Sequence, residues 1–89
     1  MSKLIKNDQL KIDILHYLAV NAGQKHSPSS LASDLNYKYE TVAKALEFLE
    51  ILSLVTKIRE EHGEKTYEYF SLTEIGKKVV QSMPGERDG

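Results

Sequence analysis

Several side chains near the middle of the sequence can form hydrogen bonds with phosphates and with the edges of bases. Lys38 and Lys44 carry ammonium groups, which donate to phosphate oxygens or to the acceptor atoms of guanine. Tyr39 and Thr41 carry hydroxyl groups that can bond to a phosphate or a base, and the methyl group of Ala43 can contact a thymine methyl. This combination predicts nucleic-acid binding, provided that one element of structure presents these residues together.

Two further groups of polar residues flank these five along the chain. Ser29 and Ser30 follow a proline at the expected start of a helix, where backbone N–H groups without helical partners can hold a phosphate. Lys57, Arg59 and Lys65 belong to a segment that we expect to form a β-hairpin, from which they can reach flanking phosphates or the minor groove. We take all five as further candidate contacts with double-stranded DNA.

The charge balance of the chain restricts how strongly it can attract nucleic acid. The 89 residues include 12 lysines and arginines and 13 aspartates and glutamates, a formal net charge of −1. Residues 36–46 hold two lysines and one glutamate, and residues 38–52 contain no arginine, the most useful residue for reading guanine. We expect weak, salt-sensitive DNA binding by each chain, strengthened when two chains bind together. In residues 56–66, the loop of the expected hairpin with its flanks, the three cationic residues are matched by three glutamates, namely Glu60, Glu61 and Glu64.

The sequence lacks the residue patterns of an enzyme or a metalloprotein. It has no cysteine, no glycine-rich phosphate loop and no serine–histidine motif, so we expect no catalytic activity and no cofactor. The three histidines, His16, His26 and His62, are far apart and do not have the paired spacing of metal ligands. We expect His16 at the edge of a helix, the other two histidines in loops, and no metal site.

The apolar residues predict three helices in the first part of the chain. Residues 8–22, 28–35 and 38–52 have apolar positions three and four residues apart, which places these positions on one helical face. Asn7 or Asp8 can cap the first helix, and the second begins with a serine and a proline, the types preferred there. The expected buried residues are Leu10, Ile14, Leu15, Leu18, Ala22, Leu31, Ala32, Leu35, Val42, Ala45, Leu46, Leu49 and Leu52.

The apolar period changes to two after the third helix, which predicts β-strands. Residues 55–59 and 66–72 are rich in β-branched and aromatic residues, and we expect the six residues between them to form a loop. Residues 73–83 return to helical spacing, with Ser71 or Thr73 as the residue that caps the helix. The expected buried face of this last helix is Ile75, Val79, Val80 and Met83.

The order of three helices, a β-hairpin and a last helix resembles the winged-helix domain, an α+β and mainly helical fold. The local sequence is similar to that of small bacterial and archaeal transcriptional regulators of the MarR, ArsR and PadR types. Residues 27–32 resemble the start of the second helix in these regulators, residues 41–55 the third helix and the entry to the hairpin, and residues 70–76 the junction after it. The family usually has glycine where Ser53 stands.

This resemblance implies a protein that binds DNA to regulate transcription. We expect one winged-helix domain at residues 8–83, an N-terminal extension at residues 1–7 and a flexible tail at residues 84–89. In such domains the third helix, here residues 38–52, enters the major groove, and the hairpin, here residues 55–72, acts as the wing. The expected bound form is a homodimer on a palindromic DNA site.

Apolar residues outside the predicted core indicate contacts with other segments or other chains. Phe48 and Ile51 lie beside the buried stripe of their helix, where they can pack beneath the N-terminal segment or meet a second chain. Tyr67 and Tyr69 lie on the strand face opposite Phe70, as half-exposed packing or as a surface for a protein partner. The alternative function is therefore a winged-helix protein-interaction module that does not bind DNA. The expected homodimer interface consists of Leu4, Ile5, Ile12, Val80 and Met83.

The apolar segments are short. No uncharged apolar run approaches the roughly 18 residues that cross a membrane, and the N-terminus lacks the apolar stretch of a signal peptide. We therefore expect no contact with membranes and a cytoplasmic location.

Overall fold

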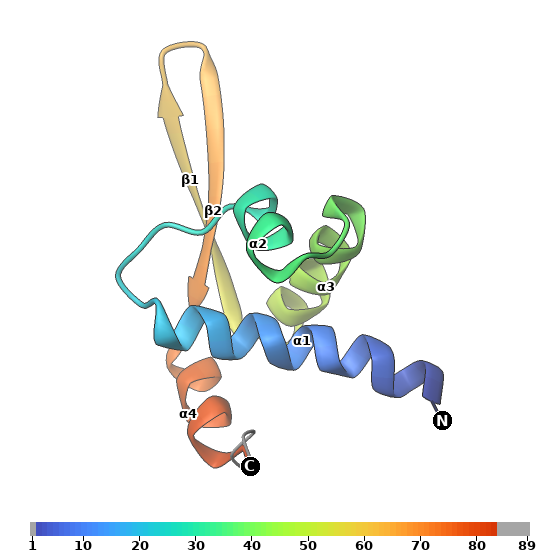
Figure 1. Cartoon of the computed structure of the whole chain (residues 1–89). Coiled ribbons are helices and arrows are strands. Elements are labelled where there is room, and N and C mark those ends of the chain that lie inside the picture. Colours follow the sequence, from blue (N-terminus) through green and yellow to red (C-terminus); the bar gives the residue numbers. More distant parts are fainter. Residues whose placement is uncertain (1, 84–89) are drawn as a thin grey trace.

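The chain folds into four helices and one antiparallel β-hairpin, in the order that the sequence predicts (Figure 1). The computed structural model describes residues 2–83, and of residues 2–8 it describes only the backbone. The α+β, mainly helical architecture is therefore confirmed. The elements are α1 (Ser2–Val20), α2 (Pro28–Leu35), α3 (Tyr39–Ile51), β1 (Val55–His62), β2 (Lys65–Leu72) and α4 (Glu74–Ser82).

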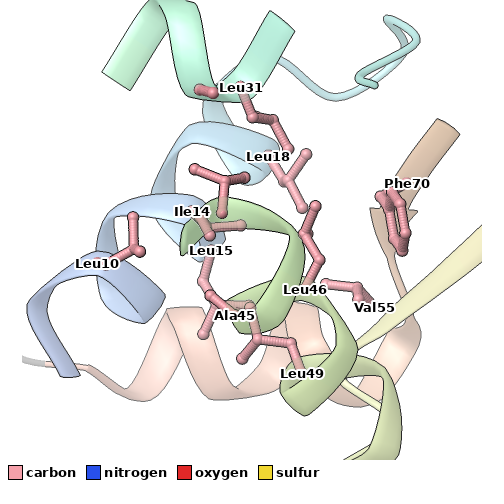
Figure 2. Close-up of a cluster of buried hydrophobic side chains, with 12 residues drawn as sticks. Leu10, Ile14, Leu15, Leu18, Leu31, Ala45, Leu46, Leu49, Val55 and Phe70 are labelled. Carbon is pink, nitrogen blue, oxygen red and sulfur yellow. The ribbon is translucent and has the colours of Figure 1, made fainter. Parts of the chain in front are cut away.

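One apolar core joins the three N-terminal helices to the base of the hairpin (Figure 2). The helical spacing predicted most of its members correctly. Ala22 and Leu52 are exceptions and are exposed, because α1 ends at Val20 and α3 at Ile51, so both residues lie beyond the helical face that is buried. The buried apolar side chains are Leu10, Ile14, Leu15, Leu18, Leu31, Ala32, Val42, Ala45, Leu46, Leu49, Val55 and Phe70.

Helix α1 is longer at its N-terminus than the sequence predicts. It begins at Ser2, so Asn7 and Asp8 lie inside the helix and do not cap it. No glycine or proline occurs before Gly23, and nothing in this stretch interrupts helical hydrogen bonding. Gly23 has a φ of 94° in the turn that follows, a conformation that glycine adopts without steric cost.

The ends of α2 and α4 are set by side-chain caps. Ser27 Oγ accepts a hydrogen bond from the N–H of Ser30 at 3.1 Å, which confirms the predicted start of α2. At α4 the cap is Thr73, whose Oγ1 accepts from the N–H of Gly76 at 3.0 Å, and not Ser71, which belongs to β2. Ile75 is 54% exposed and does not join the buried face of α4, so that prediction was wrong.

The hairpin is longer and its turn tighter than the sequence predicts. Both strands have eight residues, and their register runs from Val55 opposite Leu72 to His62 opposite Lys65. Only two residues remain for the turn, instead of the expected six-residue loop. Gly63 is the first of these two and has a φ of 66°, as a type II′ turn requires. Both strands continue through charged residues, which the projecting hairpin exposes to water.

The base of the hairpin is fixed to α4 at Ser53 and Leu54. Thr73 donates its hydroxyl to the carbonyl of Ser53 at 2.5 Å and its N–H to the carbonyl of Leu54 at 3.1 Å. Gly76 packs directly on the same Leu54 carbonyl, which a Cβ atom at that position would approach to 2.1 Å. Ser53 itself has a φ of 65°, which explains why related sequences place glycine there.

Replacing Ser53 with glycine should stabilise the fold. An L-residue in the left-handed region costs energy that glycine does not pay, so we expect the free energy of unfolding to rise by about 0.5–1 kcal/mol. Urea denaturation followed by circular dichroism measures this change. The control is Ser33→Gly, the same substitution inside the right-handed helix α2, which should lower stability by a similar amount. A Ser53→Gly variant that is less stable than the parent would contradict this explanation.

Candidate nucleic-acid interface

Helices α2 and α3 form a helix-turn-helix whose second helix points its N-terminus to the same side as the hairpin. Figure 1 shows the start of α3, the start of α2 and the hairpin tip on one side of the molecule, with α1 and α4 on the other. The turn is held by Asn36, in the left-handed conformation, and by the N–H of Tyr37, which donates to the carbonyl of Ala32 at 2.9 Å. An elongated ligand can therefore contact both helices and the hairpin at once on this side of the molecule, which we call the contact side.

The candidate residues of α3 lie on its solvent side. Lys38 is the N-cap residue and makes no side-chain capping hydrogen bond, so its exposed ammonium is available to a ligand. Tyr39 is 55% exposed, and Thr41 and Lys44 are exposed as well, while Ala43 is half-buried. The structure thus brings the five predicted residues of this helix to one end of one element.

Acidic residues share this surface. Glu40 and Glu47 are exposed on α3, on the same side of the helix as Lys44. Their carboxylates repel phosphates, so the helix offers hydrogen-bonding groups without a strong positive field. This confirms the mixed charge expected from the sequence.

The start of α2 offers fewer backbone donors than the sequence predicts. The N–H of Ser30 already donates to Ser27 Oγ, and the hydroxyl of Ser30 donates to the Ser27 carbonyl at 3.2 Å. Pro28 has no N–H. Among the first three residues of α2, the N–H of Ser29 is left for a ligand, and the side chain of Ser29 is exposed.

Two of the three predicted wing cations are paired with one glutamate of the neighbouring strand. Arg59 Nη2 lies 3.1 Å from a carboxylate oxygen of Glu68, and Lys57 Nζ lies 3.9 Å from the other. Lys65 is exposed next to the turn, and no ion pair among the described side chains, those of residues 9–83, involves it. Lys65 is thus the wing cation best placed to reach a phosphate.

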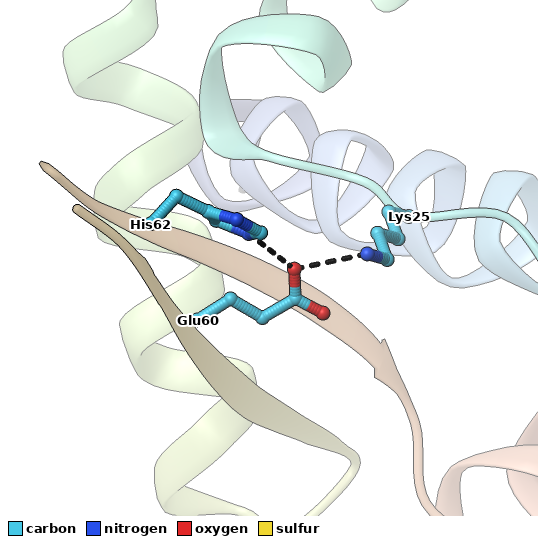
Figure 3. A network of polar contacts seen from close by, with 3 residues as sticks. All are labelled: Lys25, Glu60 and His62. Atoms are coloured by element: carbon cyan, nitrogen blue, oxygen red, sulfur yellow. Dashed lines mark hydrogen bonds and ion pairs between the residues drawn. The ribbon is translucent and has the colours of Figure 1, made fainter.

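A second carboxylate of the hairpin joins it to the loop between α1 and α2 (Figure 3). Glu60 Oε1 lies 2.9 Å from Lys25 Nζ and 3.2 Å from His62 Nε2. The hydrogen bond from Lys25, and after it that from His62, holds the pKa of Glu60 below its ordinary value. Glu60 in turn raises the pKa of Lys25. The predicted loop position of His62 was wrong, since it is the last residue of β1.

A groove at the edge of β2 contains residues that the sequence did not assign to DNA binding. It has a volume of about 490 Å³ and is lined by residues 27–29 of α2 and its cap, by Tyr39 and by residues 66–69 of β2. The rings of Tyr67 and Tyr69 stack there at 6.5 Å between centroids and 18° between planes. The alternation of the strand had placed both tyrosines on one face, but only the tertiary structure puts them beside Ser29 and Tyr39.

Apolar side chains are exposed near the end of α3. Phe48 and Leu52 are exposed, and Ile51 is 79% exposed. The ammonium of Lys11 on α1 lies 4.0 Å from the centre of the Phe48 ring, a cation–π contact. The N-terminal segment was one of the two expected partners of Phe48, the other being a second chain. The side chains of Leu4 and Ile5 in that segment, which also belong to the predicted homodimer interface, lie outside those that the structure describes.

The other residues predicted for a homodimer differ in their availability. Val80 and Met83 are half-buried and pack against the core of their own chain. Ile12 is half-buried on α1. The described chain therefore uses part of the predicted interface internally.

His26 lies in the connection between α1 and α2, as the sequence predicts, and it is buried there, with Nε2 3.0 Å from the carbonyl of Asn21 and its ring edge-on to Tyr17. Among the side chains that the structure describes, those of residues 9–83, no group of three histidine or acidic side chains could hold a metal ion. No helix within residues 2–83 is long and apolar enough to cross a membrane.

The structure resembles bacterial transcriptional regulators. No family model matches the sequence, and no curated protein matches it. Among solved structures, a DNA complex of MepR from Staphylococcus aureus aligns with a TM-score of 0.74 and 23% identity, over 91% of this chain and 59% of MepR. ZitR from Lactococcus lactis gives 0.69 and 28%, over 81% and 47% of the two chains. The adhesin competence repressor AdcR from Streptococcus pyogenes gives 0.69 and 25%, over 81% and 51%.

The chain has the winged helix-turn-helix fold. The three solved proteins are MarR-family regulators, so the resemblance to regulators of this type is confirmed at the level of the structure. The winged-helix chain spans about half the length of these proteins. In this fold α3 has the position of the second helix of the helix-turn-helix, and the hairpin β1–β2 has the position of the wing.

The ion pair between Lys25 and Glu60 should be visible in a titration of the Glu60 carboxylate. Because the folded state lowers this pKa, we expect a midpoint below the ordinary 4.5. The pair stabilises the folded state when the pH is above 4.5, the ordinary pKa of a glutamate. This stabilisation is lost as the pH falls through the lower pKa that Glu60 has in the folded state. Side-chain carboxyl NMR measures the midpoint, which should rise in Lys25→Ala and stay unchanged in Lys77→Ala. An unchanged midpoint in Lys25→Ala would show that the pair does not form in solution.

Proposed function

We propose that this chain is a sequence-specific DNA-binding transcriptional regulator that acts in the cytoplasm as a homodimer. The observation that carries the proposal is the common direction of the recognition helix and the wing, with Lys38, Tyr39, Thr41 and Lys44 exposed at the end of α3 that points outward. The MepR structure, which contains DNA, supports the proposal through its similar fold.

The N-terminal half of α3 enters the major groove. That groove is about 12 Å wide and admits one α-helix, and the first turns of the helix meet the base edges. Lys44 and Thr41 are the residues placed to donate to bases, and Lys38 and Ser29 the ones placed to hold the phosphates beside them. Lys65 extends the contact from the end of the wing.

The affinity of one chain is low in this proposal, because the contact surface is nearly neutral. Glu40 and Glu47 lie beside Lys44, and Glu68 binds the two other wing cations. A dimer doubles the number of phosphate contacts and matches a palindromic site with half-sites about 34 Å apart. Helix α1 supports dimerisation, since it extends past α3 from the body of the domain (Figure 1).

Replacing both Lys38 and Lys44 with alanine should remove most DNA binding. We expect the slope of log affinity against log salt concentration to become shallower by about 0.9, because Lys38 is the phosphate contact of the pair and each such contact contributes about 0.9. Fluorescence anisotropy with mixed-sequence duplex DNA at about 50 and 200 mM salt measures this change. The control is Lys77→Ala with Lys78→Ala, which removes the same charge from α4 on the far side of the molecule. Equal affinity of the two double variants would contradict the placement of the interface.

Light scattering at micromolar concentration tests the homodimer. We expect a mass twice that of the 10.1 kDa chain. Ile12→Lys should shift the protein toward the monomer because it places a charge on the proposed interface of α1, whereas Ile75→Lys should not, since Ile75 is exposed on α4. A monomeric mass for the parent protein at these and higher concentrations would remove the dimer from the proposal.

The second candidate function is protein–protein interaction without DNA binding. The exposed apolar surface at Phe48, Ile51 and Leu52 favours it, because single monomeric domains seldom leave neighbouring large apolar side chains exposed without a role. The anisotropy experiment separates the two functions. A folded protein that does not bind duplex DNA even at about 50 mM salt would support the interaction module.

A further inference from the structure

We propose that the groove at the edge of β2 binds the sugar–phosphate backbone of one DNA strand through neutral hydroxyl, amide and aromatic groups. The inference rests on the proposed function, and it assigns to Tyr39 and Tyr67 a role that cationic residues usually fill. In this mode the wing holds DNA beside its strand β2 rather than by charges at its tip.

The location of the groove indicates its occupant. A helix that lies in the major groove has a phosphodiester backbone on each side. Residues 27–29 and residues 66–69 stand together on one side of α3, and the groove lies between them. Tyr39 is both the first residue of α3 and part of the groove wall. A DNA strand that flanks the recognition helix on this side therefore passes through the groove.

The groove contains several neutral donors. Ser29 offers its N–H and its hydroxyl, and Tyr39 and Tyr67 offer phenolic hydroxyls next to it. Phe70 turns its N–H away from β1, toward the carbonyl of His26 at 2.8 Å. Alternate residues of a strand direct their backbone groups to the same edge, so the N–H groups of Glu68 and Thr66 also face the groove. Phosphate oxygens commonly accept hydrogen bonds from such groups.

The charges around the groove are already compensated. Glu68 is the one charged residue that lines it, and Arg59 at 3.1 Å and Lys57 at 3.9 Å bind its carboxylate. A phosphate in the groove therefore meets no unpaired carboxylate. Since no lining residue is cationic, binding here displaces few counterions, and its contribution is nearly independent of salt.

The aromatic rings are held in place before a ligand arrives. The Tyr67 ring lies between the Tyr69 ring, stacked at 6.5 Å, and the His62 ring, edge-on at 5.4 Å. Tyr69 in turn lies 5.3 Å from Lys25 Nζ. Tyr67 nevertheless remains 40% exposed, so one side of a fixed ring is open to the deoxyribose of the bound strand. Fixed aromatic residues lose little conformational freedom on binding.

Salt dependence distinguishes this mode from binding by cations. We expect Tyr39→Ala with Tyr67→Ala to lower DNA affinity at least about tenfold at every salt concentration, for two lost hydrogen bonds and the lost ring contacts, and to leave the slope of log affinity against log salt unchanged. Fluorescence anisotropy with the full chain and duplex DNA measures both quantities. Ile75→Ala, which truncates an exposed apolar side chain on α4, is the control and should bind like the parent.

A second variant keeps the experiment decisive if the alanine variant folds poorly. Tyr39→Phe with Tyr67→Phe preserves the rings and removes only the hydroxyls, and it should lose part of the affinity. Wild-type affinity in both double variants, while the parent binds DNA, would overturn the groove proposal and leave the proposed function standing. A shallower salt slope in either variant would overturn the neutral mode. If the parent itself does not bind DNA at about 50 mM salt, the proposed function fails, and the groove proposal fails with it.

Discussion

The geometry of the whole contact side depends on two backbone carbonyls, those of Ser53 and Leu54. The wing begins one residue after Leu54 and ends one residue before Thr73, so these positions are the two ends of its base. Thr73 binds both carbonyls, and the absence of a side chain at Gly76 lets α4 pack against the second. None of these groups is placed to touch a ligand. They determine the angle between the recognition helix and the wing, and thereby which parts of a duplex can be reached together.

The interface combines a nearly neutral surface with many hydrogen-bonding groups. Glu60 and Glu68 bind cations of the wing and of the α1–α2 loop, while Glu40 and Glu47 dilute the charge of α3. Non-specific DNA binding depends almost entirely on charge, whereas base recognition depends on directed hydrogen bonds. A surface of this composition therefore weakens non-specific affinity for DNA more than it weakens the discrimination between DNA sequences. The low net charge is therefore compatible with a regulator that searches for few sites.

The sequence predicted the elements well where local patterns determine them. The apolar spacing identified the buried faces of α1 to α3, and Ser27 with Pro28 identified the start of α2, because both signals depend on neighbours within one or two turns. The prediction of element boundaries failed where a strand continues through exposed charged residues. This is the case for β1, which continues to His62, and for β2, which begins already at Lys65.

The tyrosine groove could not be read from the sequence for a related reason. It exists because the contact between His26 and Phe70 brings the start of α2 beside β2, across more than forty residues of chain. The pair of Lys25 and Glu60 spans 35 residues in the same way. Ser53 is the opposite case, since the glycine usual at this position in the family fits the positive φ that the structure has there.

The narrow base and two-residue turn make the hairpin a lever. Eight residues at ~3.4 Å each give each strand a length of about 27 Å. A rotation of about 10° at Ser53 and Leu54 carries the turn at Gly63 through about 5 Å, by the geometry of an arm of that length. A displacement of a few tenths of an ångström where α4 contacts the Leu54 carbonyl thus becomes a much larger displacement of the turn at Gly63. The larger displacement is comparable with the size of a phosphate group. A shift of α4 would therefore be transmitted through Ser53 and Leu54 to the far end of the wing.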